Sequence, residues 1–265
     1  MKLAIDLGGT NARVAKGTWA SHTSRDLKGY TSDMPYSELV SLLLKTIKSV
    51  GPERVGISAP GPIYPPGVIS PSEAQSPNIR WHDENIQADL NQALSPQVYV
   101  QRDVSCAALG VLEAEDAAAF NIIYPGTGFG FATVHDSTVM QGYNNTAGEL
   151  AELDLEESTY DKALSLQRLT ELDNQNRSPE TVLQSAPTTR NKYMALLARA
   201  SAPLIAVTAP NTVFIGGHLA EAWRIIGGTL TSEYQRRLPY EPTVKETAET
   251  PLKGAFLLGD ANLHF

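Results

Sequence analysis

The chain contains a single cysteine, Cys106, which excludes an internal disulfide and any zinc site built from several cysteines. No apolar run approaches the roughly 18 to 20 residues that a membrane-spanning helix needs. The opening residues, MKLAIDLGG, hold one lysine, a very short apolar stretch and no small-residue cleavage site. We therefore interpret them as a strand rather than a signal peptide. These absences predict a protein of the reducing cytoplasm with no membrane partner.

Basic charge is also scarce, because 21 Lys and Arg stand against 29 Asp and Glu and give a formal net charge of -8. Nucleic-acid backbones select basic surfaces, so we expect no nucleic-acid partner. A nucleotide ligand is not excluded, since backbone N–H groups and a metal ion can neutralise phosphates locally. The sequence has neither a P-loop nor a G-x-S-x-G motif, which removes two common classes of enzyme.

The apolar pattern of the 265 residues predicts two α/β domains. Strands are predicted at 2–6, 11–16, 54–58, 98–100, 120–124, 129–134 and 212–215. Helices are predicted at 36–50, 85–94, 107–119, over most of 155–200, and from 216 past 223. The proline- and glycine-rich segment 59–71 is predicted to be a loop, and the charged segment 243–249 to be solvated surface. The same strand–hairpin–helix–strand theme occurs twice, with a boundary near 103–107.

The first motif is Asp6-Leu7-Gly8-Gly9-Thr10-Asn11, an acidic strand end followed by a diglycine turn. Glycines allow backbone N–H groups to approach a phosphate closely, and Thr10 and Asn11 add donors. Asp6 would then face the phosphates and hold magnesium through water. The alternative is an ordinary hairpin turn, for which this composition is common.

The second motif is Gly126-Thr127-Gly128-Phe129-Gly130. The residues after it alternate as a strand, whereas a dinucleotide fingerprint needs a helix at this place, so we reject a Rossmann site. Two glycine hairpins, one in each half of the chain, describe the pattern better. Together they would hold the phosphates of one nucleotide from both sides of a cleft.

Three further segments combine glycine or acid with a predicted strand end. Asp103 follows the strand VYV and Gln101-Arg102, where a carboxylate is well placed for catalysis or, alternatively, caps the next helix. Gly216-Gly217 would let an adenine or ribose lie against the backbone, unless it is only a strand-to-helix turn. Glu149 follows the second hairpin and would accept hydrogen bonds from sugar hydroxyls, unless it is a solvated loop residue.

The order of these motifs is more specific than any one of them. The series IDLGGTNARVA, APGPI, PNIRW, VYVQRDVSCAALG, PGTGFGFATV, TAGELAEL and APNTVFIGG resembles the ROK family of sugar kinases, within the actin/hexokinase superfamily, from about residue 3 to 258. The resemblance implies an α/β fold of two ribonuclease-H-like domains that flank an ATP cleft. These would be a small domain, 1–105, on which the C-terminal segment 252–265 packs, and a larger domain, 106–251.

The resemblance also implies the cofactors ATP and Mg²⁺, a small-molecule sugar as substrate, and roles for the matching residues. Asp103 would be the catalytic base and, with Asp6, would lie at the magnesium ion. The nucleotide would be bound by Asp6, Gly8, Gly9, Thr10, Asn11, Thr127, Gly128, Gly216 and Gly217. The sugar would be bound by Gly61, Arg102, Asp103, Glu149 and Glu152.

Three departures from the family pattern bear on the substrate. Arg102 stands where the family usually has a sugar-contacting asparagine, Glu152 stands where it has a histidine, and the cysteine-rich zinc loop is absent. Arg102 would suit an acidic or phosphorylated substrate. No DNA-binding helix-turn-helix precedes Met1, so we do not expect a repressor, and a homodimer is one assembly that the sequence permits.

We therefore predict ATP-dependent phosphorylation of a sugar hydroxyl, on a hexose or amino sugar. The alternatives are a catalytically weak sensor of sugar or nucleotide with the same fold, and an ATPase that acts in protein assembly.

Overall fold

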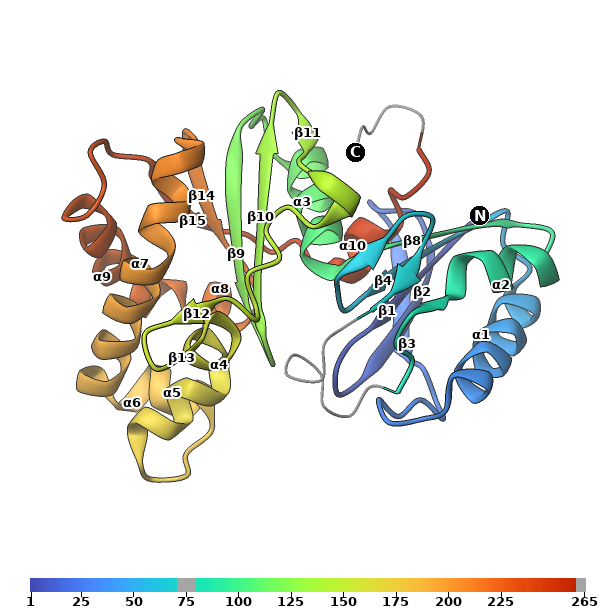
Figure 1. Ribbon diagram of the computed structural model, residues 1–265, viewed down its shortest axis with the longest axis horizontal. Helices are drawn as coiled ribbons and strands as arrows, with labels where there is room; N and C mark the ends of the chain where they lie inside the picture. Colours follow the sequence, from blue (N-terminus) through green and yellow to red (C-terminus); the bar gives the residue numbers. More distant parts are fainter. Residues whose placement is uncertain (71–79, 261–265) are drawn as a thin grey trace. The chain divides into compact units, whose positions relative to one another are not determined.

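The computed structural model describes residues 1–70 and 80–260, and these form two compact units (Figure 1). Unit 1 comprises Met1–Asp116, Thr138–Ala147 and Glu249–Phe265, and unit 2 comprises Ala117–Ser137 and Gly148–Ala248. Residues 77–79 of the PNIRW motif and residues 261–265 of the predicted C-terminal segment lie outside the described residues. No helix in the described part of the chain is both long and apolar enough to span a bilayer.

Unit 1 is built on a five-stranded sheet in the order β3-β2-β1-β4-β8. Its strands are β1 (Lys2–Leu7), β2 (Ala12–Gly17), β3 (His22–Asp26), β4 (Arg54–Ala59) and β8 (Gln97–Arg102). β1, β2 and β3 form an antiparallel meander, whereas β1, β4 and β8 run parallel to one another. The carboxyl ends of the three parallel strands therefore lie at the same edge of the sheet, where functional groups commonly gather in α/β proteins.

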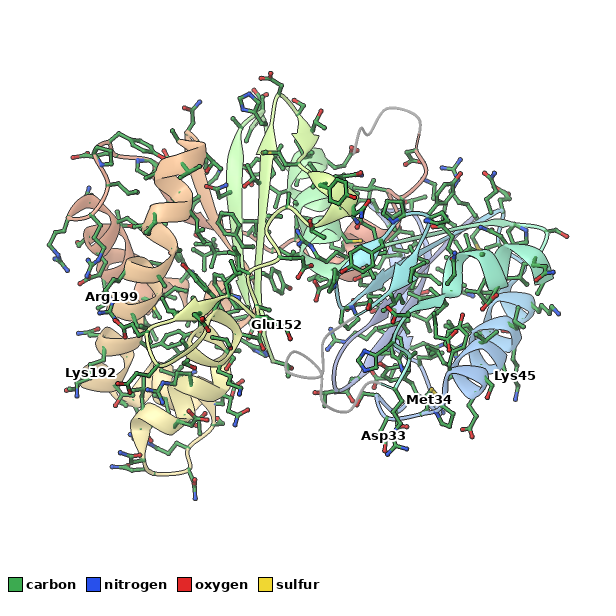
Figure 2. The ribbon with its side chains drawn as sticks, viewed as in Figure 1. Asp33, Met34, Lys45, Glu152, Lys192 and Arg199 are labelled. Carbon is green, nitrogen blue, oxygen red and sulfur yellow. The ribbon has the colours of Figure 1, made fainter. Side chains whose placement is uncertain are left out.

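Helices cover both faces of this sheet. α1 (Tyr36–Val50) and α2 (Ile86–Ala93) pack on one face, where a core of buried aliphatic side chains includes Leu39 and Leu43 of α1. Lys45, on the opposite side of α1, is exposed, and Figure 2 shows its side chain at the surface. α1 has the apolar period of an amphipathic helix, and Gly51, directly after it, takes the left-handed conformation at φ 63° that commonly ends a helix.

The other face of the sheet is covered by α3 (Asp103–Ala114) and α10 (Pro251–Ala255). Two glycines allow the backbones to approach closely. A Cβ atom at Gly56 of β4 would overlap the carbonyl oxygen of Ala255, and one at Gly254 would overlap the carbonyl oxygen of Cys106. Glycine at these two positions thus allows α10 to pack closely against β4 and α3. This is the face of the sheet on which Asp6 and Ser58 also lie.

The segment predicted as a loop, 59–71, is partly β-structure, which corrects that prediction for its described residues. β5 (Ile63–Tyr64) and β6 (Val68–Ile69) pair antiparallel, and β6 also pairs with β7 (Glu84–Asn85). The side chains of Ile63 and Ile69 are buried, and this burial stabilises the two strands. The surrounding prolines and glycines had indicated a loop instead. Unit 1 also contains β11 (Thr138–Val139) and the 3-10 helix η1 (Tyr143–Asn145).

Unit 2 repeats the meander and parallel theme with β9 (Phe120–Pro125), β10 (Phe129–His135), β14 (Thr212–Ile215) and β15 (Thr243–Glu246). β10, β9, β14 and β15 lie side by side in this order, with β9 and β10 antiparallel and the other neighbours parallel. The segment 243–249 was predicted to be solvated surface, and this is wrong. Val244 lies in register with Val213 and packs on the core, while Lys245 lies over the ring of Phe214 at 4.8 Å.

Residues 155–200 are mostly helical, as predicted, and the last helix of this stretch continues to Thr208. The short hairpin β12 (Asp154–Leu155) and β13 (Ser158–Thr159) leads into α4 (Tyr160–Leu164), α5 (Leu166–Asp173), α6 (Pro179–Ser185) and α7 (Pro187–Thr208). After β14, α8 (His218–Glu221) and α9 (Trp223–Gln235) follow. α7 packs against α9, and the buried hydroxyls of Ser201 and Tyr234 join them by a 2.7 Å hydrogen bond. This helical layer and the sheet enclose the apolar core of unit 2.

Candidate functional site

In unit 1, a row of polar residues crosses the carboxyl end of the sheet in register. Arg13 of β2 lies opposite Asp6 of β1, Asp6 opposite Ser58 of β4, and Ser58 opposite Gln101 of β8. Ser58 Oγ donates a 2.8 Å hydrogen bond to Asp6 Oδ1. Burial raises the pKa of Asp6, while the Ser58 hydrogen bond and the charge of Arg13 act in the opposite direction. Asp6 is thus a largely enclosed carboxyl group with two groups nearby that favour its charged form.

The first glycine turn follows Asp6 directly, at residues 8–11. The N–H of Gly8 donates to the carbonyl oxygen of Asn11 at 3.0 Å and closes the turn, and a Cβ at Gly8 would come 2.7 Å from that oxygen. Thr10 and Asn11 are exposed, and Gly9 is partly exposed. The hydroxyl of Tyr30 donates to the carbonyl oxygen of Gly8 at 2.8 Å. The turn is therefore available to solvent on one side and held by a tyrosine on the other.

Asp103 is the first residue of α3, directly after β8. Its Oδ1 accepts the N–H of Val104 at 2.6 Å, so the carboxyl group is held at the start of the helix and is partly exposed. One turn further along, the thiol of Cys106 is buried, and burial together with the charges of Asp6 and Asp103 raises its pKa well above the usual value. Asp6 lies near the end of β1 and Asp103 follows β8, so both residues lie at the same edge of the unit 1 sheet, and the charges of both act on Cys106.

Arg102 precedes Asp103 and is buried, with 3% of its surface exposed. Its Nη2 donates to the carbonyl oxygen of Ala147 at 2.8 Å, and its backbone N–H donates to Gln101 Oε1 at 2.7 Å. Asn145 Nδ2 donates to the same Gln101 oxygen at 2.7 Å and to the carbonyl oxygen of Ile63 at 2.8 Å. This network fixes the end of β8, and hence the start of α3, against the segment 138–147.

The network includes two residues that the sequence did not single out, Gln101 and Asn145. Gly61, predicted to contact the sugar, lies between β4 and β5, two residues before Ile63. The predicted residues Asp6, Gly8, Gly9, Thr10, Asn11, Gly61, Arg102 and Asp103 all belong to unit 1. The predicted residues Thr127, Gly128, Glu149, Glu152, Gly216 and Gly217 all belong to unit 2.

The second glycine turn joins β9 to β10 in unit 2. The N–H of Gly126 donates to the carbonyl oxygen of Gly128 at 2.8 Å, and the carbonyl oxygen of Gly126 accepts the N–H of Leu166 at 3.0 Å. Thr127, at the tip, is exposed. As in unit 1, a backbone hydrogen bond closes the turn and a neighbouring element holds it from one side.

Asp161 of α4 lies directly beside this turn, a contact that no sequence motif predicted. Its Oδ1 accepts the N–H of Phe129 at 2.7 Å, and a Cβ on Gly128 would overlap the same oxygen. Burial raises the pKa of Asp161 to about 6, the charge of Glu149 raises it as well, and the Phe129 hydrogen bond lowers it. Gly128 is thus required by the carboxyl group beside it.

The diglycine Gly216-Gly217 follows β14. The N–H of Gly216 donates to the carbonyl oxygen of Ile123 at 2.9 Å, which extends the pairing of β14 with β9. A Cβ at Gly216 would overlap the ring of Tyr124, and Gly217 has φ 63°, which favours glycine. One side of the diglycine is therefore covered by an aromatic ring that belongs to unit 2 itself.

The remaining predicted sugar residues lie at the start of the second segment of unit 2, which begins at Gly148. Gly148 takes the left-handed conformation at φ 79°, Glu149 is partly buried, and its charge acts on Asp161. Glu152 is exposed, and Figure 2 shows it on the segment that leads into β12. Glu149 is thus partly buried and its charge acts on a carboxyl group, whereas Glu152 lies at the surface.

The donors fit a magnesium ion better than a closed metal site. Across residues 1–70 and 80–260, no group of three or more His, Cys, Asp or Glu side chains is arranged to hold a metal. Mg²⁺ is commonly held by only one or two carboxylates, with waters and substrate phosphates completing its shell. Asp6 and Asp103 are two carboxylates at the same edge of the unit 1 sheet, which fits this mode of binding.

The sequence profile of the ROK family matches residues 2–161 of the chain. Among curated proteins, an N-acetyl-D-glucosamine kinase from Histophilus somni is 27% identical over 164 residues, which cover 58% of this chain and 52% of that protein. The chain spans about half the length of the curated relatives it matches.

Solved structures match nearly the whole chain. A ROK family glucokinase from Streptomyces griseus, in complex with glucose and AMPPNP, aligns with a TM-score of 0.76 at 17% identity, over 96% of this chain and 97% of that chain. A ROK family transcriptional regulator, a homolog of the E. coli MLC protein, aligns with a TM-score of 0.77 at 17% identity, over 96% of this chain and 76% of that chain. At such identities the likeness shows a fold, and kinases and regulators share it.

Proposed function

Because this chain belongs to the ROK family, we propose that it transfers a phosphoryl group from ATP to a hydroxyl of a sugar. Its fold is the two-domain actin/hexokinase-type fold of the ROK kinases, so the predicted family and fold class are confirmed. The observation that carries the functional proposal is that Asp6 and Asp103 lie at one edge of the unit 1 sheet, and that a solvent-accessible glycine turn follows Asp6 directly. A metal-binding carboxylate and a base close to a phosphate turn are what phosphoryl transfer needs.

The nucleotide is assigned to the glycine turns. We propose that N–H groups of the first turn, together with Thr10 and Asn11, contact the phosphates, and that Thr127 and Gly128 of the second turn contact phosphates of the same nucleotide. Gly216 and Gly217 would receive the adenosine on the side that Tyr124 does not cover. Both turns are closed by a backbone hydrogen bond, so their donors are ordered before ligand binds, which reduces the entropic cost of binding.

Asp103 is assigned the role of general base. It would accept the proton of the attacking hydroxyl, for which a carboxylate must lie within hydrogen-bond reach of that group. Magnesium, when bound at Asp6 and Asp103, would offset the negative charge that develops on the transferred phosphoryl group. The network of Gln101, Arg102 and Asn145 holds the strand end that leads into Asp103, and so would fix the direction in which the base points.

The sugar is assigned to Gly61, Arg102, Asp103, Glu149 and Glu152, with a hexose or amino sugar as the substrate class. Relatives named for glucose and N-acetyl-D-glucosamine support that class. Arg102 remains a proposed determinant for an acidic or phosphorylated substrate. Its guanidinium contacts the carbonyl of Ala147, directly before Gly148-Glu149, so it reaches the segment that carries a proposed sugar residue. An unchanged substrate profile in Arg102→Ala would remove this role.

A catalytically weak sensor of sugar or nucleotide is the second candidate, because a transcriptional regulator shares the fold. Glu152 in place of the family's histidine and Arg102 in place of its asparagine favour this candidate. The retention of Asp6, Asp103 and both glycine turns favours the kinase. The cytoplasmic location and a homodimeric assembly stay predictions.

A coupled assay of ADP release with Mg²⁺-ATP and a panel of sugars tests the proposal. Turnover that depends on one class of sugar supports the kinase. Saturable sugar or nucleotide binding without turnover would support the sensor instead, and ATP hydrolysis independent of sugar would indicate an ATPase of another kind. The Asp103→Asn variant is the matched control, because its amide keeps the shape of the carboxyl group.

A further inference from the structure

The second glycine turn is contacted by α4 and the start of α5 at two separate points. Asp161 Oδ1 takes the N–H of Phe129 at 2.7 Å, at the end of the turn, and the N–H of Leu166 donates to the carbonyl oxygen of Gly126 at 3.0 Å, at its beginning. Asp161 is 8% exposed, and its carboxyl group leaves no room for a side chain at position 128, where the chain has Gly128. The carboxyl group is therefore an integral support of the turn rather than a surface charge beside it.

We propose that Asp161 is a positioning residue that sets the affinity of the second glycine turn for nucleotide phosphates through its own charge. This inference rests on the proposed function, which assigns phosphates to Thr127 and Gly128. A carboxylate beside the turn places a negative charge close to N–H groups that would face another negative charge, and like charges at short range repel. A neutral carboxyl group can still accept the N–H of Phe129 through its carbonyl oxygen, so protonation removes the repulsion and keeps the support.

The surroundings of Asp161 place this change of charge in an accessible pH range. Burial and the charge of Glu149 raise its pKa to about 6. Bound phosphate would raise the pKa of Asp161 further. Protonation of Asp161 and phosphate binding are linked, so each favours the other by the same free energy. Binding should therefore be accompanied by proton uptake near neutral pH.

Other charged groups on the elements packed against α4 have partners elsewhere or are exposed. Arg168 of α5 pairs with Glu171, and Arg199 of α7 pairs with Glu156 in the turn between β12 and β13. Four other charged residues on or beside these elements are exposed, namely Asp154, Glu157, Lys162 and Lys192. The rest have partners: Asp173 pairs with Arg177, Arg190 donates to the carbonyl oxygen of Leu183, and His135 lies beside Asp136. Lys192 and Arg199 are labelled in Figure 2. In the described part of the chain, Glu149 is thus the charge that acts on Asp161.

The test is calorimetric binding of Mg²⁺-AMPPNP between pH 5.5 and 8.0 to the wild type, Asp161→Asn and the control Glu157→Gln. The asparagine keeps an oxygen acceptor for Phe129 and removes the charge, while Glu157 is an exposed carboxylate four positions earlier in the sequence. Titration of the nucleotide itself is common to all three proteins, so the readout is the ratio of affinities at each pH. We expect Asp161→Asn to bind about ten-fold more tightly than the wild type at pH 7.5 and equally at pH 5.5. This difference corresponds to a rise of about one unit in the pKa of Asp161 when the nucleotide binds. Glu157→Gln should follow the wild type throughout.

Two results would overturn the inference in distinguishable ways. Equal affinities for Asp161→Asn and the wild type at every pH, with measurable binding, would remove the role of Asp161 and leave the nucleotide site intact. No binding of Mg²⁺-AMPPNP to any of the three folded proteins would contradict the proposed nucleotide site and the role of Asp161 with it. A ¹³C NMR titration of the Asp161 carboxyl group gives an independent readout, since its pKa should rise when Mg²⁺-AMPPNP is added.

Discussion

Ser58 donates a 2.8 Å hydrogen bond to Asp6 across two neighbouring parallel strands. This bond favours the charged form of a carboxyl group that burial disfavours, and it holds Oδ1 in one direction. Hydrogen bonds to charged groups contribute about 1.5–3 kcal/mol, so we expect Ser58→Ala to weaken Mg²⁺-nucleotide binding by about ten-fold or more. Calorimetry measures this, and Ser41→Ala, at an exposed serine of α1, is the control. Unchanged affinity in Ser58→Ala would show that Asp6 does not need its partner.

Tyr30 holds the first glycine turn through the carbonyl oxygen of Gly8. Tyr30→Phe removes this hydrogen bond and leaves the ring in place, so we expect a loss of about 1 kcal/mol in the free energy of unfolding and a nucleotide affinity reduced several-fold. Tyr99→Phe is a matched control, because the hydroxyl of Tyr99 donates to the exposed side chain of Gln97 at 2.7 Å. Equal nucleotide affinities in the two variants would contradict a role for Tyr30 in ordering the turn.

Gly56 and Gly228 should respond in opposite ways to the same change. A Cβ at Gly56 would overlap the carbonyl of Ala255, whereas nothing lies within 4 Å of a Cβ at Gly228, which is exposed on α9. We expect Gly56→Ala to lower the free energy of unfolding by about 1–3 kcal/mol, because α10 must move away from β4. Gly228→Ala should raise it by about 0.5–1 kcal/mol, since alanine is the better helix residue. Urea unfolding measures both, and a neutral Gly56→Ala would mean that α10 is loosely seated.

The free energy of unfolding should depend on pH through Asp161. Its pKa is raised to about 6 in the folded chain from 3.8, so its protonated form is the one that folding favours. The resulting stabilisation is complete below pH 3.8 and is lost as the pH rises through 6. Between about pH 4 and 7 we expect the wild type to lose on the order of 2 kcal/mol relative to Asp161→Asn. Urea titrations at several pH values measure the difference, and a difference independent of pH would show that Asp161 is not perturbed.

Local patterns predicted most of the regular elements. The apolar period of 36–50 and the strand 212–215 match α1 and β14 residue for residue, and both glycine hairpins form as expected. β3 was missed because His22–Asp26 is a polar edge strand, visible only through its pairing with β2. β15 was missed because its charged residues indicated solvated surface, whereas pairing with β14 stabilises it as a strand. The predicted helix 107–119 begins earlier, at Asp103, and ends at Ala114.

The candidate site was predictable where its residues are neighbours in the sequence. Asp6 and Asp103 could be predicted because each is an acidic residue at the end of a predicted strand, and Asp6 is followed by a glycine turn. The supporting residues could not, because each acts on a partner far along the chain. Asn145 reaches Gln101 across 44 positions, and Asp161 reaches Phe129 across 32. An asparagine or aspartate in such a segment has no local signal, and only the tertiary fold shows which turn it supports.

The most direct test of the central claim compares Asp103→Asn with the wild type in sugar-dependent ADP release and in Mg²⁺-AMPPNP binding. The account predicts that kcat falls by at least about 100-fold, the usual scale for the loss of a positioned base, while nucleotide binding survives. Near-normal turnover in Asp103→Asn, with the same sugar and at the same nucleotide occupancy, would contradict it.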